Sequence, residues 1–278
     1  MIVLNRIAAL GKKVADQIAG FGVFARFCGA TCWWLIFGTK RWCRLRLLLP
    51  QLFHIGTAST PVVMVVGAFI GMVLAVETYP PFVAIGQESR LGGVIGISVV
   101  KQIGPVLAAV MLAGRVGGSV AAELGTMRVT EQLDALRAMG VDPIAHLVVP
   151  RVFACVTMIP LLTVFSDLLG IFGSWGITVG IYGVTSEQYW SFAQRFIVPY
   201  DVFVGLIKSV VFGLSIGLIS CFKGFYCQSG AAGVGRATTN AFVTSFIAII
   251  VANLFLAKLL NDVYNLIIAP GGPSAFSG

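Results

Sequence analysis

The chain has 278 residues, of which 58% are hydrophobic and 11% are charged, and its mean hydropathy is +0.94. A water-soluble domain of this size carries about twice that charged fraction, so the composition excludes an ordinary soluble protein and indicates an integral membrane protein. The formal charge of +8 then marks the side of the membrane on which Lys and Arg gather, rather than nucleic-acid binding. The six cysteines include no CxxC pair and accompany only two histidines, so no metal site is expected.

The N-terminal region, residues 1–47, mixes basic with apolar side chains and contains one acid, Asp16. Apolar residues at i, i+3 and i+4 with basic residues opposite predict amphipathic helices that lie in the membrane interface. The alternative is one more crossing at about residues 21–37. That crossing would place Arg26 inside the hydrocarbon at a cost of about 2.5 kcal/mol or more.

Five later stretches are apolar and long enough to cross a bilayer, which takes about 20 helical residues. The expected spans are residues 50–76, 91–113, 147–181, 202–222 and 241–260. The predicted fold class is therefore an all-α integral membrane protein. Residues 48–265 form its transmembrane domain, and residues 266–278 form a disordered tail.

The basic residues gather on one side of these spans. The N-terminal region, the loop between spans two and three and the loop between spans four and five together hold 14 of the 19 Lys and Arg residues. Because Lys and Arg collect in cytoplasmic loops, the N-terminus is predicted to be cytoplasmic and the C-terminus to lie outside.

Glycine pairs spaced by four residues recur within the spans and predict close contacts between helices. They are Gly67 and Gly71, Gly92 and Gly96, Gly114 and Gly118, Gly176 and Gly180, and Gly213 and Gly217.

The loop between spans two and three carries the signals of a short surface helix. Thr130 suits its N-cap, acidic residues follow in the first turn, and Gly140 suits the position just after its end. An amphipathic helix is therefore expected from Thr130 to Met139, on the cytoplasmic surface. Asp142 and Pro143 then suit the cap and first position of a second helix. The alternative to a partner-binding helix is a solvated connecting helix.

Three stretches of the chain resemble the sequence signature of the MlaE permease family. Residues 104–151 read GPVLAAVMLAGRVGGSVAAELGTMRVTEQLDALRAMGVDPIAHLVVPR, residues 206–212 read LIKSVVF, and residues 230–243 read GAAGVGRATTNAFV. The match runs in order through most of residues 50–262, which makes it more specific than a single glycine motif.

The resemblance implies a homodimeric permease in the bacterial inner membrane. Two cytoplasmic ATPase subunits would dock beneath it, and a lipid-binding protein with MCE domains would sit on the periplasmic side. A STAS-domain accessory protein is a further implied partner, and nucleic acid is not. Such a complex moves phospholipids between the inner membrane and the MCE carrier, and contributes to outer-membrane lipid asymmetry.

The resemblance also implies that the helix from Thr130 to Met139 is the coupling helix, seated in a groove of the ATPase. The residues expected to couple are Thr130, Glu131, Gln132, Asp134 and Arg137. The chain itself has no G-x-x-x-x-G-K-[ST] loop to cradle phosphates. We therefore expect no enzyme activity and no cofactor on this chain, with ATP bound by the partner subunit.

Charged residues inside the spans indicate the lipid site. Lys101 and Gln102 lie in span two, and Lys208 lies in span four, where ionisable groups are costly and are functional candidates by default. Two cations at such depth can hold one anionic headgroup, while apolar walls hold the acyl tails. The alternative is that the lysines snorkel or pair with an acid, Asp201 or Glu77.

In the family, a basic–acidic pair occupies the positions of Lys101 and Gln102, and a lysine occupies that of Lys208. Gln102 departs from this pattern, so the site is expected to be more positive and to lack the family's salt bridge. Glu77 and Tyr79 are expected at the outer mouth of the cavity, although a Tyr at this depth also suits the interfacial aromatic belt.

Two other classes of protein stay open as alternatives. An intramembrane lipid-modifying enzyme is disfavoured because there is no G-x-S-x-G motif, and because His54 and His146, near span ends, offer no expected Ser–His pair. An ion-coupled carrier is disfavoured because no inverted repeat is present and Asp167 is the one acid in mid-span.

Overall fold

A computed structural model describes residues 2–38 and 45–267 of the chain. In this part of the chain every regular element is helical and no strand occurs, which confirms the predicted all-α class. Residues 39–44, within the predicted N-terminal region, and residues 268–278, within the predicted tail, lie outside the described residues. The predicted domain limits stay predictions.

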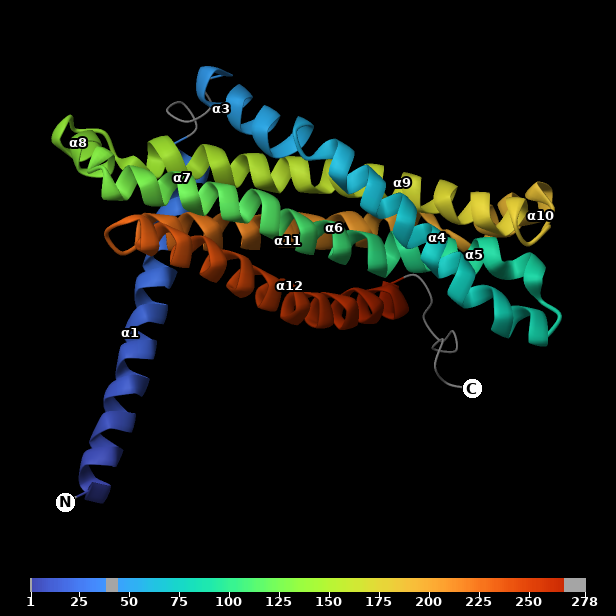
Figure 1. Ribbon diagram of the computed structural model, residues 1–278, viewed down its shortest axis with the longest axis horizontal. Helices are drawn as coiled ribbons and strands as arrows, with labels where there is room; N and C mark the ends of the chain where they lie inside the picture. The colour runs from blue at the N-terminus through green and yellow to red at the C-terminus, as the bar shows by residue number, and fades with distance from the viewer. Residues whose placement is uncertain (1, 39–44, 268–278) are drawn as a thin grey trace.

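Among the described residues, five long helical runs form a bundle along the long axis of the molecule (Figure 1). The first run contains α3 (Leu45–Leu52), the π turn η1 (Phe53–Thr57) and α4 (Thr60–Ala84). After the short η2 (Glu88–Arg90), the second contains α5 (Leu91–Ser98), η3 (Val99–Ile103), α6 (Gly104–Leu112), η4 (Ala113–Gly117) and α7 (Gly118–Val129). The others are η5 (Ile144–Val148) with α9 (Val149–Gly180), α11 (Pro199–Phe225) and α12 (Ala231–Ile267).

Two short helices mark the ends of the bundle (Figure 1). The helix α8 (Gln132–Ala138) follows α7 at one end, and α10 (Ser186–Phe196) follows α9 at the other. We call these the α8 end and the α10 end. Within the described residues the five runs follow one another between these ends, as the five predicted spans require, although α12 stops short of the α10 end (Figure 1).

Six helical runs of the described residues are long and apolar enough to cross a membrane, one more than predicted. Five of them match the predicted spans. Four contain the predicted span and extend beyond it, as in Arg46–Ala84 for the predicted 50–76, and Ile144–Gly180 ends one residue before the predicted 147–181. The sixth is Ala19–Phe37, the second half of α1 (Ile2–Phe37).

The helix α1 is inclined steeply to the five runs and meets the bundle near the α8 end (Figure 1). Its contact there is aromatic: Phe27 is buried, and its ring lies 5.6 Å from that of Phe222 and 5.8 Å from that of Phe225. A helix that crosses the bilayer with the others should run beside them along their length. The inclination therefore favours the interfacial position over a sixth crossing.

Small residues let the long helices approach each other closely. A Cβ atom on Gly71 of α4 would overlap the backbone of Gly170 on α9, and one on Gly217 of α11 would lie 3.1 Å from the Cα of Val152 on α9. Three of the five predicted glycine pairs lie at such contacts, whereas Gly176 and Gly180 face open space. α9 is thus the central helix, packed between α4 and α11.

Wide π turns interrupt the first three runs within the described residues. η1 carries His54, η3 carries Lys101 and Gln102, and η4 carries Arg115. A π turn holds one residue more than an α turn, so it turns the following side chains to a new direction, and such turns are frequent at functional sites. The lysine site at η3 and the His54 site at η1 and η4, both described below, begin at these turns.

Candidate functional site

The predicted intramembrane charges meet in one cluster between η3 and α11. The Lys101 ammonium lies 3.1 Å from the Asp201 carboxylate, and Lys208 Nζ donates to the Lys101 carbonyl oxygen at 3.0 Å and to the Gln102 side-chain oxygen. We call these four residues the lysine cluster. Lys208 is 1% exposed and Asp201 is 5% exposed, so both are removed from solvent.

The backbone explains why Lys208 fits there. Pro105 has no N–H, so the carbonyl of Lys101, four residues earlier, lacks its usual helical donor. The Lys208 ammonium supplies that donor. Gly205 on α11 allows the approach, because a side chain there would overlap the carbonyl of Val100.

The partner of Lys101 sits at the start of α11. One Asp201 oxygen accepts from the Val198 backbone N–H at 3.3 Å, and the Asp201 N–H bonds back to the Val198 carbonyl at 2.9 Å. A carboxylate in the first turn also suits the positive end of the helix dipole. Asp201 is therefore fixed before it pairs with Lys101.

The sequence left open whether Lys101 pairs with an acid, and the structure shows that it pairs with Asp201. Although Gln102 is neutral, its amide oxygen accepts from the Lys208 ammonium, so both lysines have partners within this chain. Two cations and one carboxylate still leave the cluster one positive charge in excess, and the Lys101 side chain is 29% exposed.

The other residues expected at the lipid site lie on α4. Tyr79 stacks on Tyr182, with ring centroids 3.6 Å apart and planes inclined by 9°, and lines a polar pocket at the α10 end. Glu77 is exposed on the same helix. Among the described residues, neither shares a hydrogen bond or ion pair with the lysine cluster.

The predicted surface helix is present at the α8 end but begins later than predicted. α8 spans Gln132–Ala138 and its N-cap residue is Glu131, which has a left-handed backbone with φ 58°. The prediction of Thr130 as N-cap is wrong, because its hydroxyl bonds to the Thr126 carbonyl at 2.9 Å and so closes α7. The Gln132 side chain donates to the Thr130 hydroxyl at 3.0 Å.

The charges of α8 lie on its outer face, while one apolar residue anchors it. Leu133 is completely buried. Asp134 accepts from Arg128 at 3.0 Å and from Arg137 at 2.8 Å, and the Arg137 guanidinium lies 5.7 Å from the centre of the Phe225 ring. The outer face thus carries an ordered set of exposed charges.

The end of α8 confirms the predicted cap. Gly140 has φ 73°, its N–H bonds to the Arg137 carbonyl at 2.9 Å, and the Val141 N–H bonds to the Leu136 carbonyl at 3.0 Å. This pair of bonds is the Schellman motif, which needs a left-handed residue. As predicted, Asp142 caps the next helical segment, since its carboxylate accepts from the Ile144 N–H at 2.9 Å.

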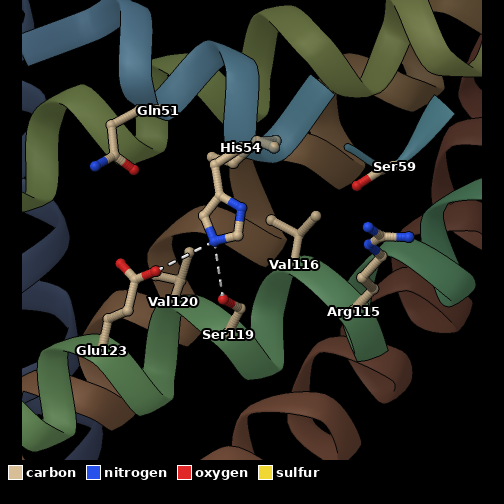
Figure 2. Close-up of a pocket in the computed structure, with 9 residues that line it drawn as sticks. Gln51, His54, Ser59, Arg115, Val116, Ser119, Val120 and Glu123 are labelled. Atoms are coloured by element: carbon tan, nitrogen blue, oxygen red, sulfur yellow. Dashed lines mark hydrogen bonds and ion pairs between the residues drawn. The ribbon is translucent and has the colours of Figure 1, made fainter. Parts of the chain in front are cut away.

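Sequence reasoning missed a second polar group at the α8 end (Figure 2). His54 Nε2 lies 3.4 Å from both the Ser119 hydroxyl and the Glu123 carboxylate. Glu123 also pairs with the buried Arg151 at 3.0 Å. The spacing of Arg115, Ser119 and Glu123 by four residues was the available signal, since it places them on one helix face.

The pairing of Ser119 with His54 was not expected, and it bears on the enzyme alternative. In a Ser–His–acid triad the serine and the acid bind different nitrogens of the imidazole ring. Here both approach the same nitrogen, Nε2. The arrangement therefore cannot relay a proton from serine to histidine while the acid holds the ring.

Asp167 packs its carboxyl group against the backbone of Gly104, next to η3, and one of its oxygens has no hydrogen-bond partner among the described residues. It forms no ion pair with the lysine cluster. Among the described residues, no group of three or more His, Cys, Asp and Glu side chains could hold a metal ion.

Comparison with known proteins matches residues 48–259 to the family described as Permease MlaE. A probable ABC transporter permease protein of Rickettsia felis is 41% identical over 264 residues, which is 94% of this chain and 100% of that protein. The intermembrane phospholipid transport system permease protein MlaE of Haemophilus influenzae is 32% identical, covering 93% of this chain and 98% of its own length. The chloroplast protein TRIGALACTOSYLDIACYLGLYCEROL 1 of Arabidopsis thaliana is 37% identical over 77% of this chain and 61% of its own.

Proposed function

The chain belongs to the Permease MlaE family and is a multi-pass membrane permease of the ABC-transporter type, and from that premise we propose that its substrate is a phospholipid. In this proposal the complex moves lipid between the inner membrane and an MCE lipid carrier on the periplasmic side, and so contributes to outer-membrane lipid asymmetry. The name of the Haemophilus influenzae relative supports the substrate class.

The observation that carries the proposal is the excess positive charge of the lysine cluster within the apolar bundle. Lys208 is held by neutral acceptors, and Lys101 shares its charge with Asp201 while remaining partly exposed. A phosphate headgroup that reaches Lys101 compensates the remaining charge. Charge-assisted hydrogen bonds of this kind contribute about 1.5–3 kcal/mol each.

The energy source in this proposal is a separate ATPase that docks on α8. The charges of Glu131, Asp134 and Arg137 are exposed there, so a partner reaches them without disturbing the buried Leu133. The proposed assembly contains two ATPase subunits and a homodimer of this chain. It also contains the MCE protein and a STAS-domain accessory protein. ATP binds to the partner subunit, and this chain needs no cofactor.

In the proposed orientation the α8 end is cytoplasmic and the α10 end is periplasmic. The N-terminus then lies in the cytoplasm and the C-terminus outside. Single cysteines at Gln132 and Gln228 should react only with a reagent added to the cytoplasmic face, and one at Gln188 only from outside. Reaction of all three from one face would contradict the five-crossing arrangement.

Lipid capture tests the substrate site. A photocrosslinking amino acid at Tyr79 should capture phospholipid in the assembled, ATP-hydrolysing complex. Lys101→Ala should lower this capture about tenfold, the change that about 1.4 kcal/mol produces. Lys208→Ala should act through Lys101 and Gln102, so the double variant should lose less than the sum of the two.

Lys258→Ala is the matched control, because Lys258 is exposed on α12 and lies outside the cluster. Capture that is equal in wild type and Lys101→Ala, in a complex that still hydrolyses ATP, would move the lipid site elsewhere. Failure of any ATPase to co-purify with the chain would instead favour a stand-alone enzyme or carrier.

A further inference from the structure

The polar group at the α8 end lines a pocket that the proposed function does not use. It lies between η1 with the start of α4 on one side and the run from η4 into α7 on the other (Figure 2). It holds about 520 Å³ of empty space, its open mouth included. The axial rise of a helix places Arg115 roughly 20 Å from Lys101, so this pocket is separate from the lysine cluster.

The pocket contains one cation without a partner. Arg115 is exposed in it and forms no hydrogen bond or ion pair with any described residue. The nearby carboxylate of Glu123 does not compensate it, because Glu123 is taken up by Arg151 and His54. With Arg151 balancing Glu123, the charge of Arg115 remains in excess.

A buried hydroxyl group also lacks a partner. Ser59 is 0% exposed, lines the pocket, and its oxygen makes no hydrogen bond with the described residues. Figure 2 places Ser59 and Arg115 on the same side of Val116, with His54, Ser119 and Glu123 on the other. A buried polar atom without a partner is costly, so a ligand that accepts a hydrogen bond here relieves that cost.

The pocket lies at the depth where apolar surface gives way to charge. Gly117, two residues after Arg115, packs against Ser220 and Ile216 of α11, and Lys223 ends the apolar run of that helix one turn later. Toward the bundle centre, the same two helical runs continue with exposed apolar side chains. They include Val62 on α4, 38% exposed, and Leu107 on α6, 36% exposed.

We infer that this pocket binds the phosphate group of a phospholipid in the leaflet at the α8 end, with the acyl chains lying along α4 and α6. The planar guanidinium of Arg115 matches two phosphate oxygens at once. The Ser59 hydroxyl donates to the same group, and Val62 and Leu107 offer apolar surface where the tails begin. The inference does not depend on transport, and its failure leaves the lysine cluster untouched.

The test uses the full-length chain in nanodiscs of phosphatidylethanolamine and phosphatidylglycerol. p-Benzoylphenylalanine replaces Gln51, which lines the pocket, and the mass of the captured adduct identifies the occupant. The same residue at Phe69, an exposed position of α4 outside the pocket, reports on bulk lipid. Phospholipid capture at position 51 should fall about tenfold in Arg115→Gln, the size of a lost charge-assisted bond, and capture at position 69 should not change.

Three variants make the result specific. Arg26→Gln removes an exposed arginine from α1 outside the pocket and should leave capture at position 51 unchanged. Arg115→Lys keeps the charge without the planar fork and should lower capture less than Arg115→Gln does. Ser59→Ala should lower capture severalfold without lowering thermal stability, because its hydroxyl has no partner to lose.

Equal phospholipid capture in wild type and Arg115→Gln overturns the inference. Equal capture of diacylglycerol with the same chains overturns it as well, since that lipid has no phosphate. If position 51 gives no phospholipid adduct that depends on Arg115, while millimolar inorganic phosphate raises the unfolding midpoint of wild type but not of Arg115→Gln, the pocket is a site for a soluble anion, and the lipid assignment is wrong.

Discussion

The lysine cluster and the α8 end both contain charged side chains, but those of the lysine cluster are mostly buried and those of the α8 end are mostly exposed. Lys208 is buried, and every strong contact of its ammonium is a contact with this chain. Arg137 and Asp134 are about half exposed, and Arg115 has no partner among the described residues. A charge in the apolar middle needs compensation from its own protein, whereas a charge near the membrane surface stays available to something else. We therefore expect changes in the lysine cluster to affect the stability of the fold as well as the site. We expect changes at the α8 end to affect mainly the binding of partners.

The largest loss of stability is expected at Asp201. Asp201→Asn leaves two lysines with no carboxylate, and breaking such a buried pair costs about 3 kcal/mol or more. We expect a clear fall in the thermal unfolding midpoint of the protein in detergent. Lys101→Gln in the same chain should restore part of it, because it removes the uncompensated charge.

Glu77→Gln is the control, since Glu77 is an exposed acid of α4 that forms no ion pair with a described residue. It should change stability by no more than about 0.5 kcal/mol. An unfolding midpoint of Asp201→Asn equal to that of Glu77→Gln would remove the distinction between the lysine cluster and the α8 end.

A smaller effect on stability is expected at the end of α8. Gly140→Ala forces an L-residue into a left-handed conformation, which costs about 1–2 kcal/mol. Because α8 is short and held by Leu133, the loss should be local and weaken ATPase docking more than it lowers the unfolding midpoint. Gly235→Ala is a helical control in open space and should be neutral or slightly stabilising. Unchanged docking in Gly140→Ala would argue against α8 as the docking element.

The smallest effect on the fold is expected from the outer face of α8. Glu131→Lys removes no side-chain contact and should cost about 0.5 kcal/mol or less. Asp134→Lys breaks two surface ion pairs and should cost about 1 kcal/mol. Both should nevertheless uncouple ATP hydrolysis from lipid transport, as measured in proteoliposomes. Wild-type transport by the double variant would show that this face does not bind the ATPase.

The sequence alone was sufficient for features that depend on neighbouring residues. Hydropathy identified the five spans of the bundle and the all-α membrane class, and the Gly140 and Asp142 caps follow from residues within one helical turn. The order of motifs along residues 104–151 was enough to indicate the family. The local pattern gave one wrong prediction, which was Thr130 as the N-cap of α8. Its hydroxyl donates instead to the Thr126 carbonyl in the preceding helix.

Only the tertiary structure decided which charges meet. Lys101 and Asp201 lie in different helical runs, as do His54 and Ser119, and no spacing in the sequence relates them. Their meeting depends on how closely the helices approach and on the direction in which a π turn aims each side chain. The inclination of α1 has the same origin, because composition allowed a surface helix and a crossing alike. Periodicity and capping are fixed by bonds within a few residues, whereas the partner of a buried charge is fixed by the packing of helices far apart in the chain.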